Sequence, residues 1–407
     1  MAIYNDNIQK NELMETLRNP SIPPNSPVVA LMTSLPQPRK RFRILSCSGG
    51  GSRGILSSTV LHRISQLTGK HPTDLFDMMI GTSTGSIIIS VMNVKDNGNE
   101  GNENNKPKYN TSALMDVYLN ECPKVFSPSM WKNVTSMYGV YGGRFSNKVR
   151  DELFQKWLGD MMLSETILPL VIPSFDMCSK QPVFFKTRKA RNDTVDDYQV
   201  QDAVKAALAA PTIFNPHTIG SRLYMDALYG KNPTMFAIIE AIKHYGVALE
   251  DIQLLHLGTG YSEDRNVENV QKITQSGVSY LFEVFNSAVN GNTVSTQYMS
   301  SELLHYRPDQ CFSVDFLLES VHMGICDVTP SHLKHLHDVA NNYVDTNLTR
   351  LADFCKELLS ESSEDVRRLE DTVDLILATR VPLPEDPPAD AEDAEDAESV
   401  LSPAAEL

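Results

Sequence analysis

The chain has 407 residues, of which 41% are hydrophobic and 21% charged, the proportions of an ordinary globular protein. Its formal net charge is −15, but nine acidic and no basic residues lie between Glu385 and Leu407, so the rest carries only −6. No basic block favours a nucleic-acid partner, and no stretch is long and apolar enough to predict a membrane-spanning helix. A chain of this length can bury a large core, in one large domain or in two to three ordinary ones.

Six cysteines are spread along the chain without a Cys-x-x-Cys pair. The first residues, Met1–Asp6, contain neither the basic nor the apolar segment of a signal peptide. Unpaired thiols and the lack of an export signal are typical of a reducing compartment. We therefore expect a cytoplasmic protein.

Residues 1–40 are rich in proline, which predicts an extended N-terminal arm. The first strand is predicted after this arm, at Arg43–Cys47, where an apolar run breaks into the glycine-rich turn Ser48-Gly49-Gly50-Gly51-Ser52-Arg53-Gly54. Residues 55–67 then show helical spacing. This order of strand, glycine turn and helix predicts a β-turn-α unit.

A second unit of the same kind follows. The apolar run Phe76–Ile80 ends in Gly81-Thr82-Ser83-Thr84-Gly85, and residues 87–94 show helical spacing. Two consecutive units of this kind indicate an α/β sheet.

Each turn suggests a chemical role. A serine on a sharp strand-to-helix turn stands clear of the sheet, and small flanking residues such as Gly81 and Gly85 tolerate the tight backbone. The three glycines before Ser52 and Arg53 leave backbone N–H groups uncovered, as an oxyanion hole or an anion-binding loop requires. The pair of turns therefore predicts a nucleophile, Ser83, beside an anion-stabilising loop.

Two other interpretations fit the first turn. Gly50-Gly51-Ser52-Arg53-Gly54 is itself a Gly-x-Ser-x-Gly sequence, so Ser52 is a second candidate nucleophile. Residues 49–54 also fit the dinucleotide pattern G-x-G-x-x-G, which makes a nucleotide-binding oxidoreductase an alternative. That pattern requires an acidic residue at the end of the second strand, where this chain has Gly81-Thr82-Ser83, so the alternative is weakened.

The rest of the chain alternates helical patterns with apolar runs of strand length, after a polar segment at 97–105 that predicts a surface insertion. Helices are predicted at 112–126, 147–162, 201–210, 232–245, 278–304, 332–359 and 363–379. Strands are predicted at 168–176, 182–186, 223–225, 252–257 and 311–318. Pro169 and Pro173 suggest an edge position for the first of these strands. The alternation favours an α/β sandwich.

A serine nucleophile needs a base. Among ten histidines, His256 precedes the turn Gly258-Thr259-Gly260, but the pattern alone selects no histidine, and a Ser/His/Asp esterase stays an alternative. A carboxylate on a loop is the other option, and Asp226 follows a short apolar run. Three histidines between residues 332 and 337 lack the spacing of a recognised metal site, so we expect no metal and no other cofactor.

Five motifs in order along residues 41–260 resemble the patatin-like phospholipase family. They are Ser48-Gly49-Gly50-Gly51-Ser52-Arg53-Gly54, Gly81-Thr82-Ser83-Thr84-Gly85, Ala210-Pro211-Thr212-Ile213-Phe214, Asp226-Ala227 and Leu257-Gly258-Thr259-Gly260. The resemblance implies a three-layer α/β/α sandwich around a mostly parallel sheet. It also implies hydrolysis of ester-linked fatty acids of phospholipids or other acyl lipids, at a membrane or micelle surface.

The resemblance further implies a Ser–Asp dyad that uses neither histidine nor metal. Carried over to this chain, Ser83 is the nucleophile and Asp226 the base. The oxyanion loop is Gly49, Gly50, Gly51, Ser52 and Arg53, so Ser52 becomes part of the loop. Gly81 and Gly85 flank the nucleophile elbow. Arg53 could pair with a lipid phosphate or brace its own loop.

Two positions depart from the family pattern: Ser48 stands where Asp is usual, and Ala227 where Gly is usual. An alanine held at positive φ costs about 1 kcal/mol and could displace Asp226. These departures motivate a second hypothesis, a catalytically impaired protein that binds lipid or a partner.

By domain, we expect a proline-rich arm (1–40), a patatin-like catalytic domain (41–350), C-terminal helices packed on or beside it (351–381) and a disordered acidic tail (382–407).

Overall fold

The computed structural model describes residues 41–96, 106–127, 143–263, 277–304, 310–360 and 362–379. The predicted proline-rich arm, the polar segment 97–105 and the acidic tail lie outside the described residues.

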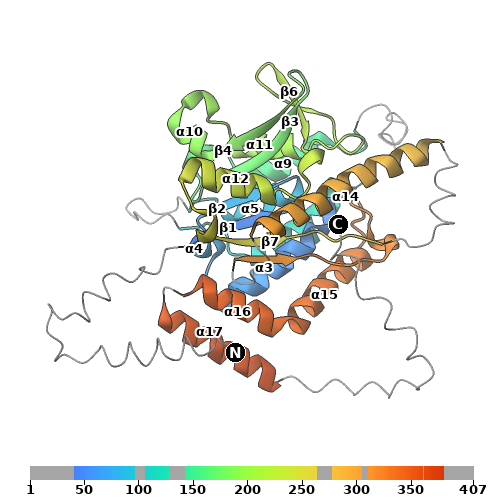
Figure 1. The fold of residues 1–407 in the computed structure, drawn as a ribbon. Helices are drawn as coiled ribbons and strands as arrows, with labels where there is room; N and C mark the ends of the chain where they lie inside the picture. The colour runs from blue at the N-terminus through green and yellow to red at the C-terminus, as the bar shows by residue number, and fades with distance from the viewer. Residues whose placement is uncertain are drawn as a thin grey trace, which may run out of the picture.

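An eight-stranded sheet forms the centre of the molecule (Figure 1). Its strands are β1 (Phe42–Cys47), β2 (Met78–Gly81), β3 (Leu170–Asp176), β4 (Gln181–Lys186), β5 (His217–Ile219), β6 (Arg222–Asp226), β7 (Ile252–Leu257) and β8 (Cys311–Val314). They lie in the order β5-β6-β3-β2-β1-β7-β8, with β4 also paired to β3. The run β3-β2-β1-β7-β8 pairs in parallel, and β4, β5 and β6 add antiparallel pairs. The sheet is therefore mixed and mostly parallel.

Each central strand buries both of its faces. In β1, Leu45 and Cys47 belong to one hydrophobic cluster. Ile44, which points to the opposite face of the sheet, belongs to another cluster. Neighbouring residues of β7 divide in the same way, with Leu254 in the second cluster and Leu255 in the first. Side chains alternate across a strand, so two separate clusters mean two separate helical layers. This confirms the predicted three-layer α/β/α sandwich.

Figure 1 labels most of the helices of the two layers. The first cluster contains side chains of α3 (Gly54–Thr68), α5 (Thr84–Met92), α6 (Ser112–Asp116), α7 (Cys122–Val125), α9 (Asn147–Leu158), α10 (Thr187–Asn192), α11 (Val200–Ala207), α15 (Pro330–Thr346), α16 (Leu348–Leu358) and α17 (Ser363–Thr379). The second contains side chains of α12 (Thr234–Tyr245) and of the end of α14 (Gly277–Leu303). A short helix, α4 (Pro72–Leu75), leads into β2.

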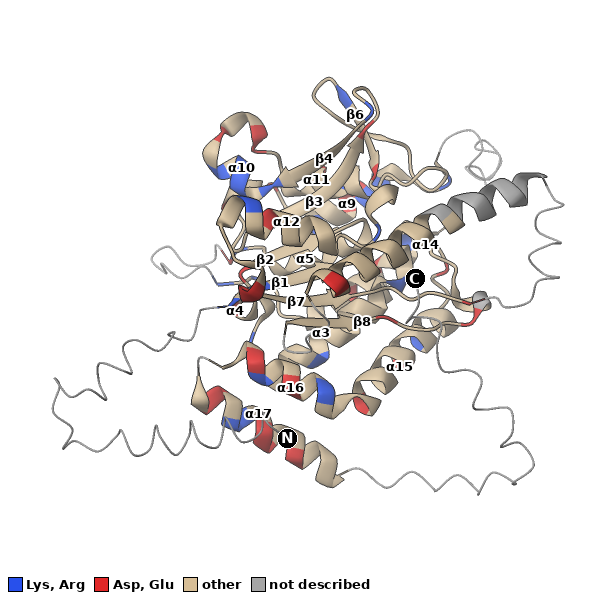
Figure 2. Cartoon of the chain, in the orientation of Figure 1, with Lys and Arg blue, Asp and Glu red and all other residues tan. Residues whose placement is uncertain are grey.

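The C-terminal helices α16 and α17 share the first cluster with α3. Phe354 and Leu358 of α16 and Leu369 of α17 are buried there. Acidic and basic residues also occur along both helices (Figure 2). Their amphipathic pattern thus buries one face and leaves charge on the other. The division of the chain at residue 350 stays a prediction.

One prediction about the sheet is wrong. β3 was expected at an edge because of Pro169 and Pro173, but β3 lies inside the sheet, paired with β2, β4 and β6. Val171 is the last residue of β3 that pairs with β2, and Ser174 the first that pairs with β6. Pro173 lies between them, where the neighbouring strand changes, so a missing backbone donor is tolerated there.

Other elements differ in detail from the predictions. The helix predicted at 112–126 divides into α6, a π-helical segment at Val117–Glu121 and α7. The helix predicted at 332–359 divides at Asn347 into α15 and α16. The three-residue strand β5 was not predicted, because so short a run has no readable alternation.

Candidate active site

The two glycine-rich turns lie side by side. β1 and β2 are adjacent and parallel, and Cys47 at the end of β1 pairs with Gly81 at the end of β2. Both turns therefore leave the same edge of the sheet. This is the edge at which open α/β sheets place their binding sites.

Ser83 has a strained backbone at the start of α5. Its φ is 51° and its ψ is −122°, a combination that non-glycine residues rarely adopt. The turn is also tightly packed. A Cβ added to Gly81 would collide with the backbone of Gly85, and one added to Gly85 would collide with the backbone of Cys47. Only glycine fits on either side, so the backbone has the sharp strand-to-helix turn expected for a nucleophile elbow.

Asp226 lies level with Ser83 in the sheet. In β3, Val171 pairs with Ile80 of β2, and Ser174, three residues later, pairs with Asp226 of β6. The Ser83 hydroxyl lies close enough to the Asp226 carboxylate to act on its pKa. Asp226 is only 3% exposed. Burial raises the pKa of Asp226 to about 7, although the neighbouring Ser83 hydroxyl acts in the opposite direction.

The Asp226 loop is tied to both glycine turns. The Asp226 N–H donates to the Ala209 carbonyl at 3.1 Å. After Asp226, the Gly230 carbonyl accepts the Thr82 hydroxyl at 2.7 Å, and the Lys231 carbonyl accepts the Gly49 N–H at 3.0 Å. The nucleophile turn, the glycine-rich turn and the Asp226 loop therefore form one hydrogen-bonded unit.

The two departures from the family pattern fit this unit without strain. Ala227 has φ −79° and is fully buried, so a side chain with a Cβ costs nothing there. Ser48 is buried, and its hydroxyl lies 3.4 Å from His256 Nε2. The anticipated penalty at Ala227 is therefore absent from the backbone.

In the predicted oxyanion loop, some backbone N–H groups donate to carbonyls of the protein and others have no acceptor among the residues that the structure describes. The N–H groups of Gly49, Ser52 and Arg53 donate to the carbonyls of Lys231, Ile325 and Gly50, respectively. Among the described residues, the N–H groups of Gly50 and Gly51 have no acceptor. At the start of α5, the N–H groups of Gly85 and Ser86 donate to the carbonyls of Thr82 and Ser83, whereas the N–H of Thr84 has no acceptor in the described part of the chain. An oxyanion near Ser83 thus has backbone donors within the two turns.

The side chains of Ser52 and Arg53 bond to carbonyls and a sulfur outside their own turn. The Ser52 hydroxyl donates to the Gly324 carbonyl at 3.4 Å. Arg53 is buried, and its Nη1 donates to the Gly260 carbonyl at 3.1 Å and to Met323 Sδ at 3.0 Å. Burial lowers the pKa of Arg53 to about 10, and the nearby Asp315 carboxylate acts against that shift. The two side chains brace the loop.

Thr259 is a supporting residue to which the sequence assigned no role. Its hydroxyl donates to the Gly49 carbonyl at 2.6 Å, and a Cβ on Gly50 would collide with its side chain. The motif Gly258-Thr259-Gly260 was recognisable, but nothing in it indicated that the threonine touches the glycine-rich turn.

His256 is held away from Ser83. Its Nδ1 lies 3.3 Å from the Ser46 hydroxyl and 3.2 Å from the Thr234 hydroxyl. Burial lowers the pKa of His256 to about 4. His305 lies outside the described residues, and none of the hydrogen bonds of the other nine histidines reaches Ser83. In the part of the chain that the structure describes, no group of His, Cys, Asp and Glu side chains could hold a metal ion.

A narrow apolar pocket adjoins the turns. Gly51 and Thr84 line it together with Tyr118, Arg150 and Phe214, among others, and its volume is about 40 Å³. The Tyr118 hydroxyl lies 2.6 Å from the Thr84 hydroxyl and fixes that end of α5.

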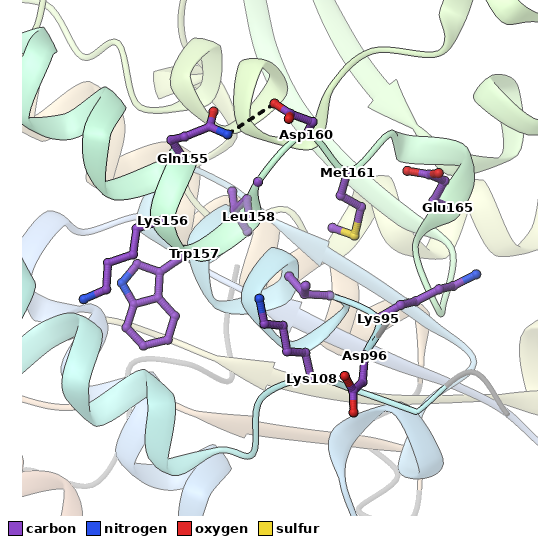
Figure 3. A pocket seen from close by; sticks show the side chains of 12 residues that line it. Lys95, Asp96, Lys108, Gln155, Lys156, Trp157, Leu158, Asp160, Met161 and Glu165 are labelled. Atoms are coloured by element: carbon purple, nitrogen blue, oxygen red, sulfur yellow. Dashed lines mark hydrogen bonds between the residues drawn. The ribbon is translucent and has the colours of Figure 1, made fainter. Parts of the chain in front are cut away.

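A larger cavity of about 840 Å³ lies elsewhere (Figure 3). Val94, Lys95 and Asp96 line it, just past the C-terminal end of α5, whereas Ser83 caps the N-terminal end of the same helix. Lys108 and Trp157 are on its wall, and Gln155 donates a hydrogen bond to Asp160 at its rim. The larger cavity is therefore not the site of the Ser83 chemistry.

Comparison with known proteins supports the family. The family model described as patatin-like phospholipase matches residues 45–238. Patatin-like protein 3 of Arabidopsis thaliana is 26% identical over 382 residues, which cover 78% of this chain and 89% of that protein. Patatin-like protein 2 of Arabidopsis thaliana is 30% identical over 265 residues, covering 58% of this chain and 64% of that protein.

Among solved structures, VipD from Legionella pneumophila aligns with 84% of this chain and 75% of its own at a TM-score of 0.34 and 12% identity, values too low to carry an argument. The family match starts inside β1 and ends inside α12, so it contains both glycine turns, Ser83 and Asp226. Residues 45–238 of this chain thus match the patatin-like phospholipase family model.

Proposed function

We propose that this protein hydrolyses ester-linked fatty acids of phospholipids or lysophospholipids, with Ser83 as nucleophile and Asp226 as base. The family implies lipid acyl hydrolysis in general. The observation that carries the specific proposal is the proximity of the Ser83 hydroxyl, at its strained turn, to the buried Asp226 carboxylate. A nucleophile beside a base is the arrangement that nucleophilic catalysis needs.

In the first step, Ser83 Oγ attacks the ester carbonyl carbon and Asp226 takes the hydroxyl proton. The negative charge on the former carbonyl oxygen is held by the free N–H groups of Gly50 and Gly51. Collapse of this intermediate breaks the ester bond, and the leaving alcohol takes the proton from Asp226. Removal of one such backbone donor typically costs about 3–4 kcal/mol of transition-state stabilisation.

In the second step, water attacks the acyl group on Ser83, and Asp226 accepts a proton from the water. The oxyanion forms again at the same donors. Its collapse returns the proton to Ser83 Oγ and releases the fatty acid. The pKa of Asp226, raised to about 7, suits a base that must accept and return a proton near neutral pH.

The protein meets its substrate at a membrane or micelle surface in the cytoplasm. All six cysteines are free, which supports a reducing compartment. None of the described helices has the length and apolar composition that crossing a bilayer requires.

A hydrolysis assay tests the proposal. Wild type, Ser83→Ala and Asp226→Asn are incubated with mixed phospholipid and lysophospholipid micelles, and released fatty acid is measured. We expect release by wild type alone. Equal release from all three proteins would exclude the Ser83–Asp226 dyad.

The alternative is a patatin fold that binds lipid or a partner without hydrolysis. A serine-reactive fluorophosphonate probe separates the two functions, because it labels only an activated serine. We expect one labelled peptide, containing Ser83, and none in Ser83→Ala. Wild type that stays unlabelled while lipid shifts its melting temperature would favour the binding function.

A further inference from the structure

Arg150 is a buried cation beside the candidate active site. It lies in the first turns of α9, is 1% exposed, and lines the narrow pocket that also contains Gly51 and Thr84. Among the described residues that line this pocket, Arg150 alone carries a charge. With Phe154 and Leu158 it follows an i, i+4, i+8 pattern, so the arginine occupies the apolar stripe of its helix.

The guanidinium group is incompletely paired. Its Nε donates to Asp151 Oδ1 at 2.9 Å, and Nη2 lies 2.8 Å from the same oxygen. Within the described part of the chain, Nη1 has no hydrogen-bond partner although it is buried. Burial lowers the pKa of Arg150, and Asp151 opposes the shift. A buried cation without full pairing is costly, and an anion bound at Nη1 would remove that cost.

A second arginine flanks the same aromatic side chains. The Arg150 guanidinium lies 5.2 Å from the Phe214 ring centre, and that of Arg144 lies 5.2 Å from the Phe145 ring centre. The two rings are 6.2 Å apart. Arg144 Nε is also buried without a hydrogen-bond partner among the described residues. Two guanidinium groups with spare N–H donors thus border one aromatic pair.

The backbone around the aromatic pair is held under strain. Thr212 has φ 70°, an unusual value for a β-branched residue. Its carbonyl accepts the Arg144 N–H at 2.9 Å, and the next carbonyl, of Ile213, accepts the Phe145 N–H at 3.0 Å. These bonds fix the segment of Arg144 against the segment of Phe214. Strained residues held by their surroundings cluster at functional sites.

Stacking on an aromatic ring accounts for only part of this arrangement. A cation–π contact is worth about 0.5–2 kcal/mol and uses the face of the guanidinium, which leaves its N–H donors open in the plane. Those donors match the geometry of an oxyanion group.

We propose that Arg150, with Arg144 beside it, forms a subsite that binds the phosphate group of the acyl ester hydrolysed at Ser83. The proposal rests on the proposed function of Ser83. Phosphate is favoured over carboxylate because two guanidinium groups match its several charged oxygens. Because the pocket is too narrow for a phosphate group and its glycerol, its aromatic side chains must move aside when the substrate binds. The enzyme then selects lysophospholipids and phospholipids over neutral acylglycerols.

Matched substrates test the selection. Monomeric 1-acyl lysophosphatidic acid and 1-monoacylglycerol with the same acyl chain differ only in the phosphate. We expect wild type to hydrolyse the phosphate ester with the higher kcat/KM, and Arg150→Met to reduce this preference by about 10- to 100-fold, the range for a hydrogen bond to a charged group. Arg150→Lys should keep part of the preference, and Arg144→Met should lose a smaller part.

A control lies on the same helix. Lys148 is 84% exposed, so Lys148→Met removes a positive charge two residues away without touching the pocket. It should keep the wild-type preference, which separates a local subsite from long-range attraction. Melting temperatures identify any variant that fails to fold. If Arg150→Met fails to fold, the substrate preference of wild type and its loss in Arg144→Met test the subsite instead.

A binding experiment separates this proposal from the proposed function. In Ser83→Ala, lysophosphatidic acid should raise the melting temperature more than monoacylglycerol does, and adding Arg150→Met should abolish the difference. That result would stand even if wild type hydrolyses neither ester. Equal kcat/KM for the two substrates, or a preference untouched in folded Arg150→Met, would overturn the subsite. A preference for esters with a carboxylate at the far end of the acyl chain, lost in Arg150→Met, would also overturn it.

Discussion

The two Gly-x-Ser-x-Gly turns of this chain have the same sequence pattern and opposite environments. Ser83 lies at a positive φ at the start of α5, and its side chain meets a buried carboxylate. Ser52 lies in a 3₁₀ turn, where its N–H and its hydroxyl both bond to carbonyls of the segment before α15. Ser83 therefore lies beside a base, whereas the N–H and the hydroxyl of Ser52 donate hydrogen bonds to backbone carbonyls.

The difference shows what the pattern alone leaves open. In the second turn, glycine stands at 81 and 85 because two backbones approach closely there, and the serine takes the strain. In the first turn, the positive φ is on Gly51, so Ser52 is unstrained. Strain on the serine, and a proton acceptor beside it, therefore distinguish the candidate nucleophile from its sequence twin.

Removing each hydroxyl gives the largest expected effect. Ser83→Ala should lower kcat for lysophospholipid hydrolysis by about 10³- to 10⁶-fold, the range for loss of a nucleophile. Ser52→Ala should change kcat less than about tenfold, because it removes only a long bond to Gly324. Fatty-acid release under saturating substrate measures both. Similar decreases of kcat in Ser83→Ala and Ser52→Ala would contradict the assignment of the nucleophile to the second turn.

Close backbone approach gives the next effect. Gly85→Ala places a methyl group against the Cys47 carbonyl, so we expect loss of activity and a melting temperature lower by several degrees. Gly291→Ala is the matched control. Gly291 lies in α14 with open space at its Cβ, and alanine there should raise stability slightly. An active and stable Gly85→Ala would contradict the tight elbow.

The Asp226 carboxylate, which lies beside the second turn, predicts a pH dependence that the first turn lacks. Asp226 must be ionised to accept a proton, and its pKa is raised to about 7. Below pH 7, log kcat/KM should therefore fall by about one per pH unit, and above pH 7 it should level off. The pKa of His256, lowered to about 4, keeps that residue neutral throughout.

A neutral monomeric ester, assayed from pH 5 to 9, measures this profile. Phosphate-bearing substrates are avoided because they titrate in the same range. A flat profile from pH 5.5 to 8 would argue against Asp226 as the base.

The fold was largely predictable from local patterns. Apolar runs that break into glycine predicted β1 and β2 and the helix that follows each of them. β3 was misplaced, since Pro173 is tolerated inside the sheet only because the neighbouring strand changes from β2 to β6 there. No single-sequence pattern reports such a change of partner.

Less of the candidate site was predictable. Order along the chain suggested Ser83 and Asp226, but their contact depends on register across β2, β3 and β6. Two roles were predicted for Arg53, pairing with a lipid phosphate or bracing its own loop. Its buried hydrogen bond to the Gly260 carbonyl favours the second role. Arg150 had a readable signal, a charge on an apolar helix stripe. Thr259 had none, because its partner, Gly49, is 210 residues away.

The smallest expected effect concerns Thr259, whose hydroxyl bonds to the first turn. Thr259→Val keeps the side-chain shape and removes the hydrogen bond to the Gly49 carbonyl, leaving a buried acceptor unpaired. Such a loss costs about 1–3 kcal/mol of stability. If the loop also loses its alignment with Ser83, kcat should fall about tenfold while KM changes little, because the oxyanion exists only in the transition state. Thr259→Ser retains the hydroxyl and should keep most of kcat. If Thr259→Val loses stability without losing kcat, the bond serves folding alone, and the N–H groups of Gly50 and Gly51 are aligned by the bond from Gly49 to Lys231 instead.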